Sequence, residues 1–189
     1  MTDVADRYRK LSSQFLATVR QVPPDAWEAP SPCEGWTARD VVRHVADTSA
    51  FFTGRATGGT ADAPSVDDDP VAAAEGALGA VQSALDDPAS ATRTYQTPMG
   101  ESTLEQTVGA FGLADLLLHA WDLGKAAGLH PTLDPEESRR VLAQMEPMGD
   151  MVRRSGVFGP AVPVPADADD GARLLGFTGR DPSWASPQG

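Results

Sequence analysis

Residues 115–128 read Asp-Leu-Leu-Leu-His-Ala-Trp-Asp-Leu-Gly-Lys-Ala-Ala-Gly, a run of apolar side chains interrupted by a few polar ones. We predict that this stretch is the second half of a long helix that Ser102 or Thr103 caps and that ends at the final glycine. Asp115 and His119 are four residues apart, so a helix places both side chains on one face. Leucines flank this pair, and a charged carboxylate among leucines is costly unless it is paired or bound to a metal.

The rest of the chain is organised around this helix by further helical patterns. Apolar residues at three- and four-residue steps, together with capping residues and helix breakers, mark the expected elements. The patterns predict helices at residues 2–21, 37–58, 70–87 and 134–152. Residues 57–70 predict a surface loop, and residues 92–97 predict a short extended segment. The fold class that follows is an all-α bundle.

Two regions are expected along the chain. Residues 1–156 hold the predicted bundle and form the expected metal-binding domain. Residues 157–189 are rich in proline and predict an irregular arm that packs on the bundle, with one short helix near residues 168–176.

Composition excludes several classes of function. The 189 residues include 15 Lys and Arg against 27 Asp and Glu, a formal net charge of -12, which argues against nucleic acid and anionic membranes as partners. The one cysteine, Cys33, excludes an internal disulfide and a cysteine-built zinc finger. The first residues lack the apolar core of a signal peptide, so we expect a cytoplasmic protein. We also expect that the protein acts on a small molecule. Its broad apolar helix faces are compatible with a homodimer.

His44 lies on the apolar stripe of the second predicted helix. Together with Asp115 and His119 it forms a set of two histidines and one carboxylate, which leaves positions on a divalent metal open to water or substrate. The alternative is a buried histidine that is satisfied by a hydrogen bond, with Asp115 as its partner. Spacing alone leaves both interpretations open.

Three other polar residues remain, and two of them have two interpretations each. Asp122 follows His119 by three residues, so it either orients that ligand or serves as a packing or capping residue beside Trp121. Cys33 precedes the Thr37 cap and is either a reactive thiol near a helix N-terminus or a buried structural thiol. His130 is expected on the surface.

Three motifs resemble one known family. The first is Ser31-Pro-Cys-Glu-Gly-Trp-Thr-Ala-Arg-Asp-Val-Val-Arg-His44, the second is residues 115–128, and the third runs from Phe158-Gly-Pro-Ala-Val-Pro-Val-Pro to Gly179-Arg-Asp-Pro. Together they resemble the mycothiol-dependent maleylpyruvate isomerase N-terminal domain family, part of the DinB-like group of metal-binding four-helix bundles. The tail is similar to that of a small, single-domain subfamily.

The resemblance implies a DinB-like bundle of up-down-down-up topology, here with an extra helix and an irregular C-terminal arm. It also implies a divalent metal, most commonly zinc, with nickel, iron or manganese as alternatives, held by His44, Asp115 and His119. Asp115 departs from the family, which usually has glutamate there. The isomerase itself carries a further C-terminal domain, so maleylpyruvate isomerisation is not expected of this chain.

The resemblance further implies a divalent-metal-dependent thiol S-transferase. A thiol of the mycothiol type would be the cosubstrate, and its thiolate would attack a small electrophile. Two alternatives belong to other classes: a non-catalytic scaffold that binds a metal or a ligand, and a metal-dependent hydrolase with zinc-bound water as the nucleophile.

Overall fold

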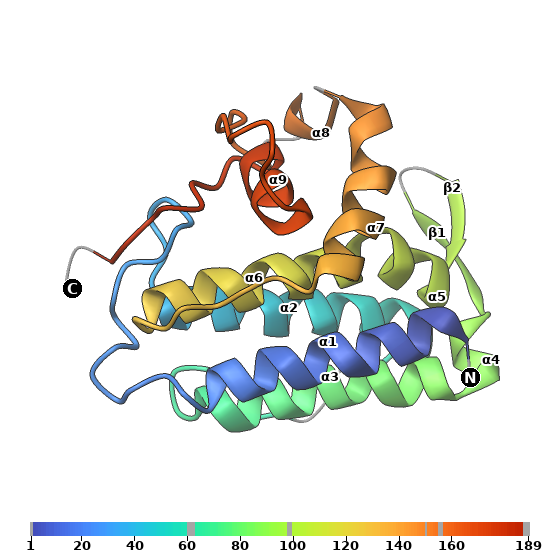
Figure 1. Cartoon of the computed structure of the whole chain (residues 1–189). Helices are drawn as coiled ribbons and strands as arrows, with labels where there is room; N and C mark the ends of the chain where they lie inside the picture. Colours follow the sequence, from blue (N-terminus) through green and yellow to red (C-terminus); the bar gives the residue numbers. More distant parts are fainter. Residues whose placement is uncertain (1, 60–62, 98–99, 150, 155–156, 187–189) are drawn as a thin grey trace.

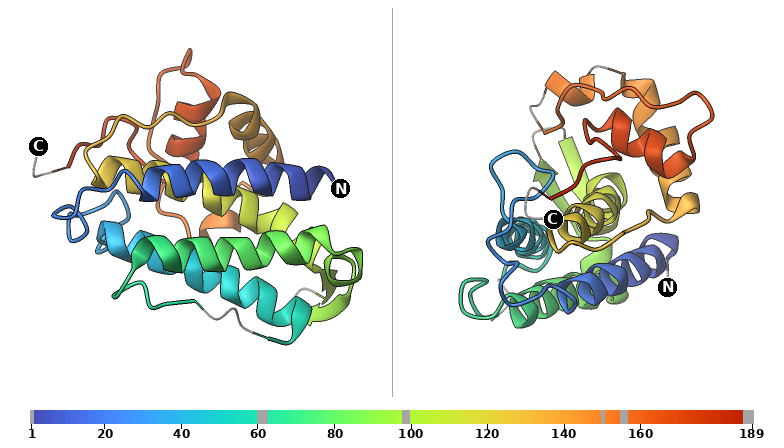
Figure 2. Two further views of the ribbon diagram at one scale, coloured as in Figure 1. Left: turned by 90° about the horizontal axis from the view of Figure 1, so that it is seen from below. Right: turned by 60° about the vertical axis from the view of Figure 1, so that its left-hand side comes forward.

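The computed structural model describes residues 2–59, 63–97, 100–149, 151–154 and 157–186. Four long helices lie side by side in it: α1 (Asp3–Val19), α2 (Ala38–Thr57), α3 (Pro70–Asp86) and α6 (Leu113–Ala126) (Figure 1). Helices α1 and α6 run in one direction and α2 and α3 in the other, which is the up-down-down-up order. Figure 2 shows α2 and α3 packed along their length. The all-α fold expected from the sequence is therefore confirmed.

Local sequence signals start and stop these helices as expected. Thr37 caps α2 by accepting from the backbone N–H of Asp40, and the Asp40 carboxylate accepts from the backbone N–H of Thr37. Gly58 ends the helix in the left-handed region at φ 76°, where a side chain would be strained. Asp69 caps α3, with Pro70 in its first turn.

The long helix predicted from residue 102 or 103 contains a change of helical pitch. It begins at α5 (Leu104–Thr107), where Thr103 and Gln106 form a capping box. A π-helical turn (Val108–Gly112) follows and leads directly into α6. The backbone N–H of Leu113 donates to the carbonyl of Val108, five residues back.

The four long helices enclose the core. Its largest fully buried side chains come from each of them, from α5 and from α9: Tyr8, Leu11, Phe15 and Val19 of α1, Val41, Val42 and Val45 of α2, Leu78 of α3, Leu104 of α5, Leu113 and Leu123 of α6, and Leu174 of α9. Complete burial of such side chains is the main force that holds the helices together, at about 1.5–3 kcal/mol for each one.

A small hairpin connects α3 to α5. After α4 (Pro88–Ala91), strands β1 (Thr94–Thr97) and β2 (Gly100–Thr103) pair antiparallel, with Thr94 opposite Thr103. The extended segment expected at residues 92–97 is thus one strand of this hairpin.

The predicted fifth helix is shorter than expected. Instead of spanning residues 134–152, it ends as α7 (Pro135–Met145), and a 3-10 turn (Glu146–Met148) follows. Pro147 explains the break, because proline lacks the N–H that an α-helix needs and its ring crowds the preceding turn.

Two short helices complete the chain. Helix α8 is Met151–Arg154, and α9 (Asp170–Phe177) packs against α7 above α6 (Figure 1). Residues 157–169 have no regular secondary structure. Among the described residues, no helix has the length and apolar character needed to cross a membrane.

Candidate metal centre

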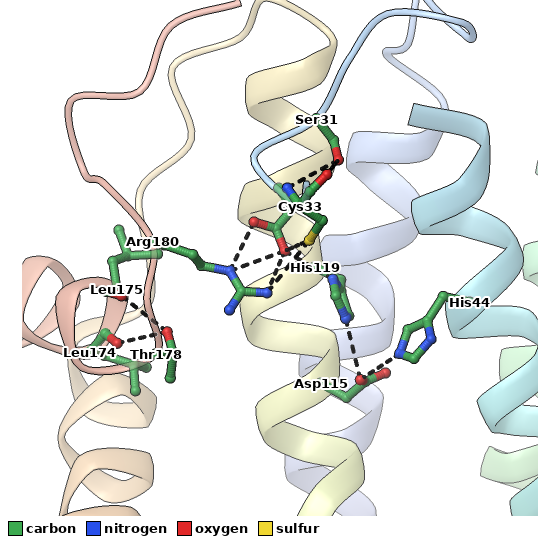
Figure 3. A network of polar contacts seen from close by, with 10 residues as sticks. Ser31, Cys33, His44, Asp115, His119, Leu174, Leu175, Thr178 and Arg180 are labelled. Atoms are coloured by element: carbon green, nitrogen blue, oxygen red, sulfur yellow. Dashed lines mark hydrogen bonds and ion pairs between the residues drawn. The ribbon is translucent and has the colours of Figure 1, made fainter. Parts of the chain in front are cut away.

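The fold brings the three predicted ligands together. His44 of α2 faces α6, where Asp115 and His119 are one helical turn apart (Figure 3). Asp115 Oδ1 lies 3.1 Å from His44 Nε2 and 3.4 Å from His119 Nε2. One nitrogen from each histidine and one carboxylate oxygen thus converge on a single point, all within 4.8 Å of one another.

The centre is open on one side. The side chain of His119 is 9% exposed and that of Asp115 22%, whereas His44 is 36% exposed. Trp36 covers the two rings, with its centroid 4.9 Å from that of His44 and 5.9 Å from that of His119. A small molecule can therefore approach along the His44 side without displacing the core.

The charges within the centre are strongly coupled. Burial alone would raise the pKa of Asp115, but His119 and His44 outweigh it and hold that pKa well below its usual range. Burial alone would likewise lower the pKa of His119, and Asp115 and Asp122 raise it well above the usual value. The metal-free centre is thus an ionised carboxylate between two imidazole rings, of which that of His119 is protonated. A cation that binds there would displace this proton.

Asp122 orients His119 from behind. Its side chain is fully buried, and its Oδ2 lies 2.9 Å from His119 Nδ1. A carboxylate accepts, so Nδ1 carries the proton and Nε2 is left to face Asp115. Asp122 therefore shows the orienting geometry, one of its two expected roles, rather than that of a helix cap.

Arg180 and Cys33 also donate to Asp122. Arg180 donates to both carboxylate oxygens, from Nε to Oδ1 at 2.9 Å and from Nη2 to Oδ2 at 2.7 Å. The half-buried Cys33 thiol donates to Oδ2 at 3.3 Å. Burial raises the pKa of Asp122, but His119 and Arg180 together lower it to about 2.

Arg180 is the residue that sequence reasoning missed. It lies in the segment predicted to be an irregular arm, 58 residues beyond Asp122. The only sequence signal was its place in the Gly179-Arg-Asp-Pro end of the third motif. His130, by contrast, is exposed as expected.

Among the residues that the structure describes, two groups of side chains have metal-ligand spacing, and only one of the two suits a cation. The second group is Cys33, His119 and Asp122, again within 4.8 Å of one another. The guanidinium of Arg180 already contacts Asp122 and lies 3.8 Å from the Cys33 sulfur. A second positive charge there would face strong repulsion at short range in a buried site.

The first group fits a divalent ion. Two neutral imidazole nitrogens and one carboxylate oxygen suit zinc and similar metals, and they leave open positions. The hydroxyl of Tyr8 is also buried, and burial and the charge of Asp115 raise its pKa while Ser49 opposes that rise. Among the described residues it has no hydrogen bond of regular geometry.

Comparisons with known proteins bear on the family of this chain. Two uncharacterized proteins of Mycobacterium tuberculosis, from strains CDC 1551 / Oshkosh and ATCC 25618 / H37Rv, are each 29% identical over 175 residues. The matches cover 92% of this chain and 95% of each relative. No solved structure matches. Residues 8–82, which include Tyr8 and His44, match the mycothiol maleylpyruvate isomerase N-terminal domain, and the family resemblance expected from the sequence is thereby confirmed.

Proposed function

We propose that this chain binds a divalent metal ion through His44, Asp115 and His119 and transfers a thiol to a small electrophile. The observation that carries the proposal is the convergence of three donor atoms within 4.8 Å, at a place open on the His44 side. A divalent ion supplies positive charge that favours the thiolate form of a bound thiol at neutral pH. Zinc is the metal that we expect, because this donor set is common in zinc sites.

The protein's own residues would prepare the site. Asp122 holds the proton on His119 Nδ1 and thereby fixes the nitrogen that faces the ion. Trp36 shields the rings of both histidines from water. The exposed edge of His44 leaves room for the thiol and the electrophile.

Thiol transfer is favoured over hydrolysis by the state of Asp122. A hydrolase needs a general base whose pKa is close to the working pH. Asp122, the carboxylate behind His119, has its pKa lowered to about 2 and is held by Arg180. It is therefore a poor general base. This favours a nucleophile that loses its proton readily, and a free thiol, with a pKa of about 8.5, is far more acidic than water.

Metal analysis tests the first part of the proposal. The wild-type protein, reloaded with zinc and desalted, should retain one ion per chain by elemental analysis. His119→Ala should retain little, and His130→Ala is the matched control because His130 is exposed and belongs to neither group of closely spaced candidate ligands. A wild-type protein that retains no zinc would refute the metal site.

A conjugation assay tests the second part. Zinc-loaded protein is mixed with mycothiol and monochlorobimane, and the fluorescence of the thioether product is followed. We expect a rate above the spontaneous reaction for the wild type and the spontaneous rate for His119→Ala. Stoichiometric zinc without any acceleration, across a panel of electrophiles, would favour the binding scaffold instead.

A further inference from the structure

We propose that Arg180, on the segment that follows α9, is a positioning residue of the metal centre. It holds Asp122 so that His119 presents Nε2 to the ion. The inference rests on the metal binding in the proposed function and does not depend on thiol transfer. The inference gives the C-terminal segment a role in metal binding.

The contacts form a chain of three links. Arg180 donates to Asp122 through Nε and Nη2, at 2.9 Å and 2.7 Å. Asp122 accepts from His119 Nδ1 at 2.9 Å, and the opposite nitrogen of that ring faces Asp115. Neither end of the ion pair is in water, since the side chain of Arg180 is 10% exposed and that of Asp122 is fully buried.

Arginine suits this position better than lysine. Its planar fork matches the two oxygens of a carboxylate, and here it engages both of them. This fixes the rotation of the Asp122 carboxylate as well as its charge. The Oδ2 atom therefore stays directed at His119, and the imidazole ring cannot turn without losing that bond.

The backbone directs Arg180 toward Asp122. Helix α9 ends in a Schellman motif, in which the N–H of Arg180 donates to the carbonyl of Leu175 and the N–H of Gly179 donates to that of Gly176. Gly179 has φ 83°, and a Cβ there would lie 3.0 Å from the backbone of Gly159. Only glycine adopts this positive φ without strain and also leaves room for the backbone of Gly159, so the chain leaves α9 in a fixed direction.

A third segment meets the same carboxylate. The Cys33 thiol, in the loop before α2, donates to Asp122 Oδ2, and it lies 3.8 Å from Arg180 Nη2. Asp122 is thus the point at which the loop, helix α6 and the C-terminal segment are joined. Releasing Arg180 leaves only the thiol and the imidazole to position this buried charge.

The test compares Arg180→Gln and Arg180→Lys with Arg173→Gln. Arg173 lies on α9, seven residues before Arg180, but it is exposed, and its partners are Asp170 and Glu146 at the surface. The dissociation constant for zinc is measured by competition with a chelating indicator, and the visible spectrum of the cobalt-loaded protein reports ligand geometry. Urea unfolding of the metal-free proteins measures stability separately.

We expect Arg180→Gln to weaken zinc binding by about 10- to 100-fold, the usual effect of losing an outer partner of a ligand, and to alter the cobalt spectrum. Arg180→Lys keeps the charge but loses the fork, so its spectrum should also change. Arg173→Gln should match the wild type in zinc affinity and in the cobalt spectrum. If Arg180→Gln does not fold, the spectrum of cobalt-loaded Arg180→Lys tests the positioning role of Arg180 by itself.

Two results would overturn the inference, and they are distinguishable from failure of the metal site. The first is a zinc affinity of Arg180→Gln within twofold of wild type. The second is a wild-type cobalt spectrum in a folded Arg180→Lys protein. A wild-type protein that binds neither metal would instead refute the metal site itself, and the inference with it.

Discussion

Replacing Asp122 by asparagine should destabilise the metal-free protein strongly. The amide has nearly the shape of the carboxylate but no charge, so the change leaves Arg180 buried without its counter-ion. His119 also loses the charged acceptor of its Nδ1 proton. Little of the packing changes, and the loss is therefore electrostatic.

The pKa of Asp122 gives the size of the effect. It is lowered from 3.8 to about 2, so the folded protein favours the ionised form by about 2.5 kcal/mol, at about 1.4 kcal/mol for each pKa unit. Breaking a buried ion pair by removing one partner commonly costs about 3–5 kcal/mol. We expect the free energy of unfolding at pH 7 to fall by about 2–5 kcal/mol.

The same reasoning fixes how the effect depends on pH. Because the folded pKa of Asp122 lies below its unfolded value of 3.8, its stabilisation is fully present above that value. It is lost as the pH falls through the folded pKa of about 2, with about half remaining at pH 3. The difference between wild type and Asp122→Asn should therefore shrink between pH 5 and pH 3.

Urea unfolding at pH 7, 5, 4 and 3 measures this difference. Glu75→Gln is the matched control, since Glu75 pairs with Arg20 at 2.7 Å with both side chains exposed, and such pairs contribute about 0–1 kcal/mol. A loss below about 1 kcal/mol for Asp122→Asn at pH 7 would show that the ion pair is not what stabilises this part of the molecule. A loss independent of pH would refute the electrostatic explanation.

Four further changes have defined outcomes. Thr37→Ala removes the cap of α2 and should lower the free energy of unfolding by about 1 kcal/mol in urea. Gly176→Ala places a Cβ 2.5 Å from the carbonyl of Val162 and should lower the melting temperature through a loss of about 1–3 kcal/mol; Gly79→Ala, which meets nothing within 4 Å, should raise it slightly. Tyr8→Phe deletes a buried hydroxyl without a partner, so the metal-free protein should be as stable as the wild type or more stable by calorimetry, and a loss above about 1 kcal/mol would show that the hydroxyl is satisfied.

The sequence predicted those features that depend on neighbouring residues. Thr37 and Asp40 marked the start of α2 because a capping box involves only one turn of chain. Asp115 and His119 were paired for the same reason, through their helical step. The fifth helix was predicted too long because its apolar pattern continues past Pro147, whose ring breaks it.

Features that depend on packing were beyond such reasoning. His44 was grouped with the other two ligands from its place on an apolar helix stripe and from the resemblance, but 71 residues separate it from Asp115, and only the packing of α2 against α6 brings the two together. The pairing of Arg180 with Asp122 depends on where α9 lies, and no local signal encodes that position. The division into a bundle of residues 1–156 and an arm of residues 157–189 stays a prediction.

The π-helical turn before α6 determines which way the side chains of α6 point, and therefore whether Asp115 and His119 face His44. Along this helix the buried residues Leu104, Val108, Leu113 and Leu117 advance by four, five and four positions. One residue more than an α-helix needs is thus stored in the turn, and each residue rotates an α-helix by about 100°. Losing a single residue there would swing Asp115 out of reach of His44 without altering either side chain. A relative that gains or loses one residue in this turn would therefore gain or lose the site, so relatives should be aligned outward from the turn.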